Sequence, residues 1–178
     1  CERPIDIGID LVANRQLERS TLFINDDGTP DFNTFQGEWG FPSWTGQGFL
    51  RFDYDKFRLT WETRYISSVR QDEAALDPFS DVFTSPFSDT CLGPPSDVLC
   101  RDIGYADNYY LHNMSLYYYG DQWTFGGGIR NLFDEEPPRI DSNHTDVLAV
   151  NNTPLGYGYD LMGRVFFFNV AVNFAGGE

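Results

Sequence analysis

Three consecutive glycines, Gly126 to Gly128, stand in an aromatic stretch that continues into an arginine and an acidic segment, WTFGGGIRNLFDEEPP (residues 123–138). Glycine-rich segments bind phosphate when they follow a strand and open a helix, as in the dinucleotide fingerprint G-x-G-x-x-G. Here Asn131 occupies the position of the third glycine, and no helical pattern follows. The glycines therefore do not indicate a phosphate-binding loop.

Two polar segments could contribute metal ligands. His144 in DSNHTD lies near Asp141 and Asp146, but this spacing matches no defined metal motif, so a solvated loop is the favoured interpretation. NDDGTPD (residues 25–31) is similar to a calcium loop but lacks the terminal glutamate of that motif. We expect no metal site and no cofactor.

Catalytic motifs are not found in the sequence. G-x-S-x-G, H-E-x-x-H and G-x-x-x-x-G-K do not occur, and the chain has only two histidines, His112 and His144. His112 is expected near the outer end of a strand, where interfacial packing is its favoured role. A nucleophile, a base and an orienting group cannot be assembled from these residues, so we expect no enzymatic activity.

Composition narrows the class of protein. The 178 residues suit one domain, and the 16 phenylalanines and 10 tyrosines require a large apolar environment. The net charge of −15 and the lack of a basic stripe argue against nucleic-acid binding, which depends on lysine and arginine clusters. The acidic surface is compatible with solubility or cation binding.

Export is not signalled at the start of the chain. No run of 18 apolar residues occurs, which excludes a membrane helix, and Glu2, Arg3 and Asp6 interrupt any signal-peptide core. Cys1 could carry a lipid, although a chain numbered from an internal position can begin anywhere. Cys91 and Cys100 bracket CLGPPSDVLC and could form a disulfide in an oxidising compartment.

Hydrophobic alternation with a period of two predicts strands. In FRLTWETRY, Phe57, Leu59 and Trp61 alternate with polar residues, and short polar turns, DYDK and YGDQ, join two predicted hairpins. The expected strands lie near residues 4–17, 43–54, 56–68, 107–119, 122–133 and 157–174. Their connections alternate between short (54–56, 119–122) and long (18–42, 69–106, 134–156).

This alternation of connection lengths favours an antiparallel transmembrane β-barrel over a soluble sandwich. Outer-membrane barrels have short periplasmic turns, long extracellular loops, an apolar outer face and aromatic belts. Sandwich connections are usually short at both ends. The charged side chains of the strands share the opposite face, so they are expected to line the lumen of the barrel: Arg58, Glu62, Arg64 and Arg130.

Aromatic residues gather at the short-turn end of the predicted strands. An interfacial belt would lie there, formed by Tyr54, Phe57, Tyr118, Tyr119, Trp123 and Phe174.

The three glycines can be explained if their segment is a strand, because a glycine in a strand marks a place where another group approaches the backbone closely. Gly126 and Gly128 are expected to leave the inner wall bare where something inside the barrel approaches it.

Two stretches carry a family resemblance. GGGIRNLFDEEPP, followed by YDLMGRVFFFNVAVNF, resembles the closing segment of TonB-dependent outer-membrane receptors, which often show G-x-x-N-L-F-D-x-x-P and an aromatic-ended last strand. Gly163-Arg164 is similar to a recurrent Gly-Arg pair early in that strand. The resemblance implies that the segment after Asp134 is an outer loop and that Phe174 is the terminal aromatic recognised in barrel assembly. It also implies that the lumen-facing side chains contact a plug: Arg58, Glu62, Arg64 and Arg130.

Six strands cannot form a complete barrel. The smallest bacterial barrels have about 8 strands and plugged transporters about 22, and six strands would leave two open edges in lipid. We therefore expect residues 1–178 to be the last six strands of a roughly 22-stranded receptor, either as a fragment or completed by another polypeptide. The plug domain of the family and its TonB-contacting box have no counterpart in this chain.

The resemblance implies active import across the outer membrane of a Gram-negative bacterium. Its partners would be outer-membrane lipid and lipopolysaccharide, the plug, the remaining strands, the TonB energy-transducing complex and a scarce siderophore, vitamin, oligosaccharide or peptide. Trp39, Phe41 and Trp44 near the first long loop could stack on that nutrient. The alternatives are a non-transporting adhesin or partner-binding barrel and, with no supporting residues, a barrel enzyme.

Overall fold

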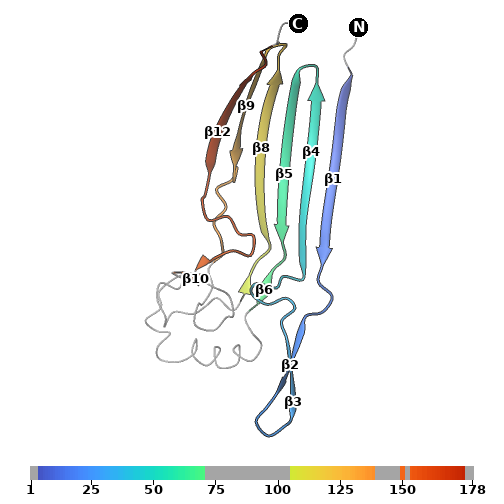
Figure 1. Ribbon diagram of the computed structural model, residues 1–178, viewed down its shortest axis with the longest axis vertical. Coiled ribbons are helices and arrows are strands. Elements are labelled where there is room, and N and C mark those ends of the chain that lie inside the picture. Colours follow the sequence, from blue (N-terminus) through green and yellow to red (C-terminus); the bar gives the residue numbers. More distant parts are fainter. Residues whose placement is uncertain (1–3, 71–104, 139–148, 151–152, 175–178) are drawn as a thin grey trace.

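The computed structural model describes residues 4–70, 105–138, 149–150 and 153–174. Their main element is a six-stranded sheet in which each long strand pairs antiparallel with the next long strand of the chain (Figure 1). The described residues are all-β, as the alternation predicted. The sheet order is β1 (Ile5–Arg15), β4 (Trp44–Tyr54), β5 (Phe57–Ile66), β8 (Tyr109–Tyr119), β9 (Trp123–Arg130) and β12 (Val165–Val172).

Short strands also form within the long connections, where alternation predicted none. They pair as β2 (Ser20–Ile24) with β3 (Pro30–Thr34), β6 (Val69–Arg70) with β7 (Tyr105–Ala106) and β10 (Ala149–Val150) with β11 (Thr153–Pro154). The β2–β3 hairpin projects beyond the sheet at the end of the long connections (Figure 1). No helix in the described part of the chain is long and apolar enough to cross a membrane.

The two ends of the sheet differ as the connection lengths predicted. The β4–β5 and β8–β9 turns lie at one end, together with the start of β1 and the end of β12, and the strand ends that the long connections join lie at the other (Figure 1). The two turns contact each other, since Lys56 Nζ lies 2.7 Å from Asp121 Oδ1. The hydrogen bond that the Lys56 ammonium group donates to Asp121 lowers the pKa of that carboxyl group.

Two predicted strand boundaries are wrong for a backbone reason. The last strand begins at Val165 instead of 157, because Gly156, Tyr157 and Gly158 have φ of 85°, 56° and 91°, which no β-strand accommodates. Similarly, β9 ends at Arg130 instead of 133, because Asn131 has a φ of 52°. Short polar residues such as asparagine adopt this left-handed conformation more readily than others.

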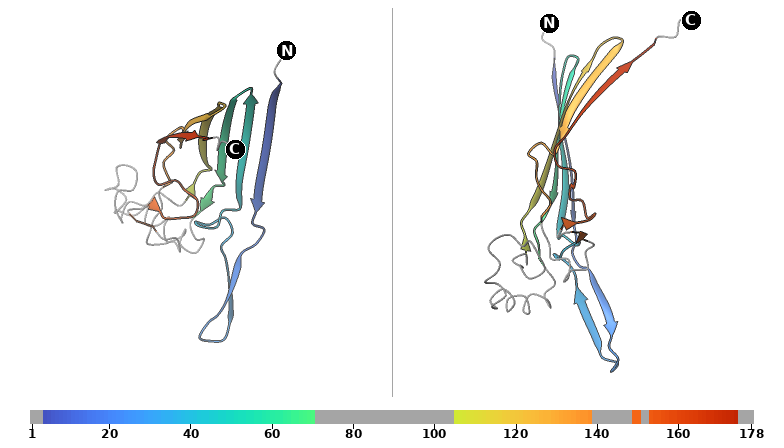
Figure 2. Two further views of the ribbon diagram at one scale, coloured as in Figure 1. Left: turned by 45° about the horizontal axis from the view of Figure 1, so that its top comes forward. Right: turned by 90° about the vertical axis from the view of Figure 1, so that its left-hand side faces the viewer.

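The sheet is a single twisted layer (Figure 2). It does not close: among the described residues, no strand pairs with the outer edge of β1 or of β12. Each of these edges therefore carries backbone N–H and C=O groups that the strands of this sheet leave unpaired.

One face of the sheet is apolar across all six strands. The strand registers align its side chains in consecutive rows, and the middle row contains one glycine and no polar side chain. The rows, from the short turns toward the long connections, are Ile5, Tyr54, Phe57, Tyr118, Phe125 and Val170; Ile7, Phe52, Leu59, Leu116, Gly127 and Phe168; and Ile9, Leu50, Trp61, Met114, Ile129 and Phe166.

This apolar face is uncovered. Ile7, Leu116 and Phe168, from an edge strand, an inner strand and the other edge strand, are 64%, 52% and 71% exposed. The buried apolar residues of the described chain instead form two small clusters at the long-connection end, Trp39 with Val69 and Ala106, and Ile66 with Tyr109, Leu111 and Tyr159. A water-soluble domain would bury the apolar face of its sheet.

Candidate functional site

The second face of the sheet carries its charged side chains, and it is the candidate site. Arg58, Glu62 and Arg64 alternate along β5 with the apolar residues, and Arg130 lies on the same face of β9. We call this surface the polar face. The predicted segregation of these four residues from the apolar side chains is confirmed, whereas their contact with a plug stays a prediction.

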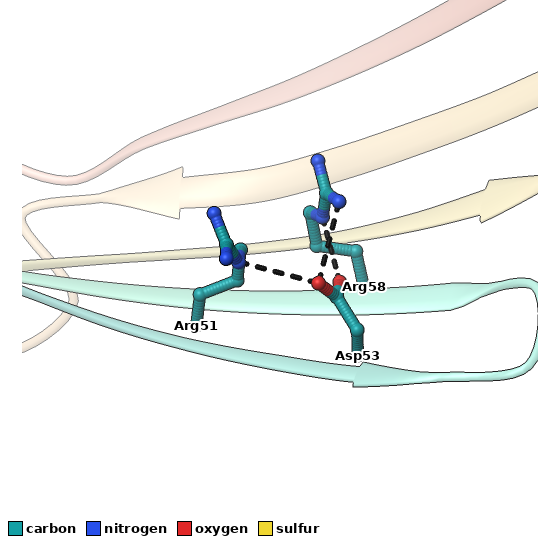
Figure 3. A network of polar contacts seen from close by, with 3 residues as sticks. All are labelled: Arg51, Asp53 and Arg58. Carbon is teal, nitrogen blue, oxygen red and sulfur yellow. Dashed lines mark hydrogen bonds and ion pairs between the residues drawn. The ribbon is translucent and has the colours of Figure 1, made fainter. Parts of the chain in front are cut away.

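A cluster of charges lies near the short turns on the polar face (Figure 3). Arg58 donates from Nε and Nη2 to the two carboxylate oxygens of Asp53, at 2.7 and 3.3 Å. Arg51 Nε lies 3.2 Å from Asp53 Oδ2. Two guanidinium groups therefore share one carboxylate, so the cluster carries a net positive charge. Because these groups are partly exposed, their attraction contributes little stability.

A chain of hydrogen bonds begins at Glu62 in the middle of the polar face. Gln47 Nε2 on β4 donates to Glu62 Oε1 at 2.6 Å, and Asn113 Nδ2 on β8 donates to Glu62 Oε2 at 2.9 Å. Asn113 Oδ1 accepts the backbone N–H of Asn131 at 2.9 Å. These bonds connect three strands of the polar face to the turn that follows β9.

That turn contains the Asn-Leu-Phe-Asp stretch of the sequence. The Asn131 side chain is 0% exposed; its Nδ2 donates to Glu135 O at 2.9 Å and its Oδ1 accepts Glu135 N–H at 2.7 Å. Asp134 Oδ1 accepts the Arg164 N–H at 2.8 Å. A Cβ at Gly163 would lie 3.3 Å from the same Asp134 oxygen. The two stretches that carry the family resemblance therefore contact each other, and their contact fixes the start of β12.

Gln47 and Asn113 were not among the residues expected at the site. Both occupy polar-face positions in their strands, which was visible in the alternation. The contact of Asn113 with Glu62 was not, because Asn113 faces Glu62 only through the β5–β8 register. A connection as long as that between β5 and β8 leaves the register open.

The expectation for the glycines needs a correction. An added Cβ at Gly126 would overlap the Tyr117 ring, and one at Gly128 would overlap the Met114 carbonyl oxygen and the Phe167 ring. Rings of the neighbouring strands β8 and β12 thus cover the bare wall, as aromatic residues do beside strand glycines. No group from outside the sheet is needed to explain these glycines.

The three aromatic residues expected to bind a nutrient are not gathered on one surface. Trp39 is 2% exposed and packs with Val69 and Ala106. Phe41 lies under the Arg19 guanidinium group, 4.2 Å from its ring centroid. Trp44 is exposed on the apolar face, with Arg15 5.3 Å from its ring. Their role in ligand binding stays a prediction.

His112 lies near the long-connection end of β8, as expected. Its ring packs against Trp61 and Phe133, with centroid distances of 5.6 and 5.2 Å, and Trp61 Nε1 donates to His112 Nδ1 at 3.3 Å. Tyr119 differs from expectation: it lies at the short-turn end but on the polar face, where it stacks with Tyr117 and lies near Arg58.

The segment that is similar to a calcium loop, residues 25–31, forms the tip of the β2–β3 hairpin and the start of β3. Asp27 Oδ1 accepts hydrogen bonds from the backbone N–H and the side-chain hydroxyl of Thr29, at 2.9 and 2.6 Å. These hydrogen bonds lower the pKa of Asp27. Among the described residues, no three potential metal ligands lie together. His144 and the three cysteines, including Cys91 and Cys100, lie outside the described residues.

Phe174 follows the end of β12 and is exposed, and its assembly role stays a prediction.

One pH effect is expected at the long-connection end. Tyr159 is buried against Tyr109, and burial raises the pKa of its hydroxyl to about 12. Because the folded pKa lies above the unfolded pKa of about 10, this residue's contribution is complete below pH 10 and is lost as the pH rises toward 12. We expect near-ultraviolet circular dichroism to report loss of tyrosine packing across this range. Tyr159→Phe should reduce that transition to the part contributed by Tyr109, whose pKa burial also raises, and an unchanged transition would contradict the assignment.

Comparisons with known proteins add one distant likeness. No protein-family model matches the sequence, and no curated protein matches it. Among solved structures, the crystal structure of the ferric-catecholate import receptor Fiu from K12 E. coli, in its closed form, is similar with a TM-score of 0.48 and 13% identity. The match covers 96% of this chain and 25% of that receptor, so the chain spans about a quarter of that receptor's length.

Proposed function

We propose that this chain is a wall segment of an outer-membrane transporter that imports a scarce nutrient. The observation that supports the proposal most directly is the set of aligned apolar rows, which extend across all six strands and are left uncovered by the described residues. In a bilayer these rows meet hydrocarbon, and the polar face meets the lumen. The chain would then be localised to the outer membrane of a Gram-negative bacterium.

The open edges of β1 and β12 define the next requirement. An unpaired strand edge in hydrocarbon costs several kcal/mol for each exposed backbone group. Further strands, from the same receptor or from a partner chain, would pair with both edges and complete a barrel of roughly 22 strands. Outer-membrane lipid and lipopolysaccharide would surround the apolar face.

The polar face supports the transport part of the proposal. Its two arginines Arg51 and Arg58 share the carboxylate of Asp53, and Glu62 contributes a carboxylate to the same face. Such groups could pair with a plug that moves when the TonB complex delivers energy. The sequence resemblance in the turn after β9 and in β12 suggests this mechanism. No catalytic step is part of the proposed function.

Uptake by living cells tests this function. Cells with and without the full-length protein would be supplied with radiolabelled ferric chelates, cobalamin, oligosaccharides and peptides. We expect one of these to accumulate only when the protein is present and the inner-membrane proton gradient is intact. Accumulation that persists after the gradient is collapsed would contradict energy-coupled import.

A non-transporting, partner-binding barrel is the second candidate. It is favoured by the β2–β3 hairpin, which extends past the sheet and exposes Leu22, Ile24 and Phe32 on one of its faces. A protein that inserts in the outer membrane but accumulates none of the four nutrient classes would support this candidate instead.

A further inference from the structure

A cavity of about 280 Å³ lies on the polar face, near the long connections. Strands β1, β4 and β5 form its floor, and the segment between β11 and β12 forms one wall. Its size is near the lower limit of small-molecule sites, which are about 300–1,000 Å³. The polar and aromatic lining includes Asn14, Thr45, Gln47, Arg64 and Tyr157.

Arg64 is the cation of this cavity. Among the described residues, no carboxylate lies within ion-pairing distance of its guanidinium group, although the chain as a whole carries a net charge of −15. The nearest carboxylate along β5, that of Glu62, is already held by Gln47 and Asn113. A guanidinium group without a carboxylate partner is suited to bind an anion with two hydrogen bonds.

The wall of the cavity has a strained backbone. Gly156, Tyr157 and Gly158 adopt positive φ in succession, and a tyrosine in this conformation is uncommon. A Cβ at Gly158 would lie 3.4 Å from Arg64 Nη2 and 3.3 Å from Ile66 Cδ1. The glycine therefore lets this wall approach Arg64 closely. Strained backbone that other contacts hold in place is frequent at ligand-binding sites.

We propose that this cavity binds the carboxylate group of a small molecule, with Arg64 as the anchoring cation and Tyr157 beside the rest of the ligand. Asn14 and Thr45, which are directly paired between β1 and β4, supply further hydrogen-bonding groups at the floor. The inference deepens the proposed import function and rests on it, since it assigns a carboxylate to the nutrient. The cavity's position near the long connections suits entry from the loop side.

Benzoate and benzamide are matched probes, because they share size and shape and differ in charge. Binding of each to the full-length protein in detergent micelles would be measured by ligand-observed NMR. We expect benzoate to bind at least tenfold more tightly than benzamide. We expect Arg64→Gln to weaken benzoate binding about ten- to hundredfold, as the loss of a hydrogen-bonded charge predicts, and Arg64→Lys to restore part of it.

Two further variants separate the cavity from general effects on folding. Gly158→Ala and Gly156→Ala place alanine at similar positive φ, but only the first adds a methyl group in contact with Arg64 and Ile66 at the cavity, since nothing lies within 4 Å of a Cβ at Gly156. We expect only Gly158→Ala to weaken benzoate binding, by at least fivefold. Arg15→Gln removes a charge at the same end of the sheet on the other face and should leave binding unchanged.

The outcomes distinguish this inference from the proposed function. Equal binding of benzoate and benzamide, no binding of benzoate, or unchanged binding by Arg64→Gln would overturn the carboxylate site even if uptake were energy-dependent. Destabilisation by Arg64→Gln without weaker benzoate binding would also overturn it and assign Arg64 to contact with a plug. If benzoate binds as expected and no nutrient accumulates, the site stands and the import function fails.

Discussion

Leu59→Arg is expected to destabilise the full-length protein in lipid by about 2–4 kcal/mol, the cost of an arginine near the middle of the hydrocarbon layer. Leu59 lies on the inner strand β5, in the second apolar row between Phe52 and Leu116. Urea unfolding from phospholipid vesicles would measure the loss, and the fraction of protein that reaches the outer membrane would report insertion. Trp61→Arg should behave similarly, since Trp61 lies in the next row.

Thr60→Arg is the matched control, one residue away on the polar face. The new guanidinium group would lie beside Arg51, its cross-strand neighbour, so a penalty of about 0.2–1 kcal/mol is expected from like charges. Insertion should remain normal. If Leu59→Arg and Thr60→Arg reduced insertion equally, the two faces would not differ in their contact with lipid.

Asn131→Ala is expected to cost about 3 kcal/mol. It leaves the N–H and C=O of Glu135 without their side-chain partner, each at about 1 kcal/mol or more, and it holds alanine at a φ of 52°, which costs about 1–2 kcal/mol. Hydrogen exchange would localise the effect: the amides of Glu135 and Arg164 should exchange faster, because the turn that positions Asp134 loosens.

Two substitutions separate the contributions at Asn131. Asn131→Gly removes the side chain, but glycine adopts the positive φ without strain. It should therefore destabilise the protein less than Asn131→Ala, and the difference should equal the backbone strain of alanine at this φ. Asn169→Ala removes an asparagine that makes one exposed hydrogen bond, to Tyr117, and should cost less than about 1 kcal/mol. Equal losses for Asn131→Ala and Asn169→Ala would contradict the structural role of the turn.

The alternation in the chain was sufficient to predict the sheet and its two faces. Successive side chains of a strand point to opposite sides, so the apolar positions of β5 had to share a face whatever the rest of the fold. The short turns also set the pairing of β4 with β5 and of β8 with β9, since a tight turn leaves little choice of register. The last strand was placed too early because nothing in the pattern marked the left-handed conformation of Tyr157.

Contacts between strands that the long connections join could not be predicted from the sequence, because they depend on the three-dimensional arrangement of those strands. The bonds from Glu62 to Asn113 and from Asp134 to Arg164 join residues far apart in the chain, and they require a particular register between β5 and β8 and a particular path into β12. The burial of Trp39 against Val69 and Ala106 is of the same kind.

The physical reason is the same for all of these contacts. Alternation of apolar and polar residues is a local property of each strand, and a two-residue turn fixes the register between that strand and one neighbour. A connection of twenty or more residues does not fix the register between the strands that it joins, because a flexible loop closes at nearly the same entropic cost for several registers. The choice among those registers depends on side-chain contacts, such as those of Asn131 and Tyr117, that exist only once the strands have paired.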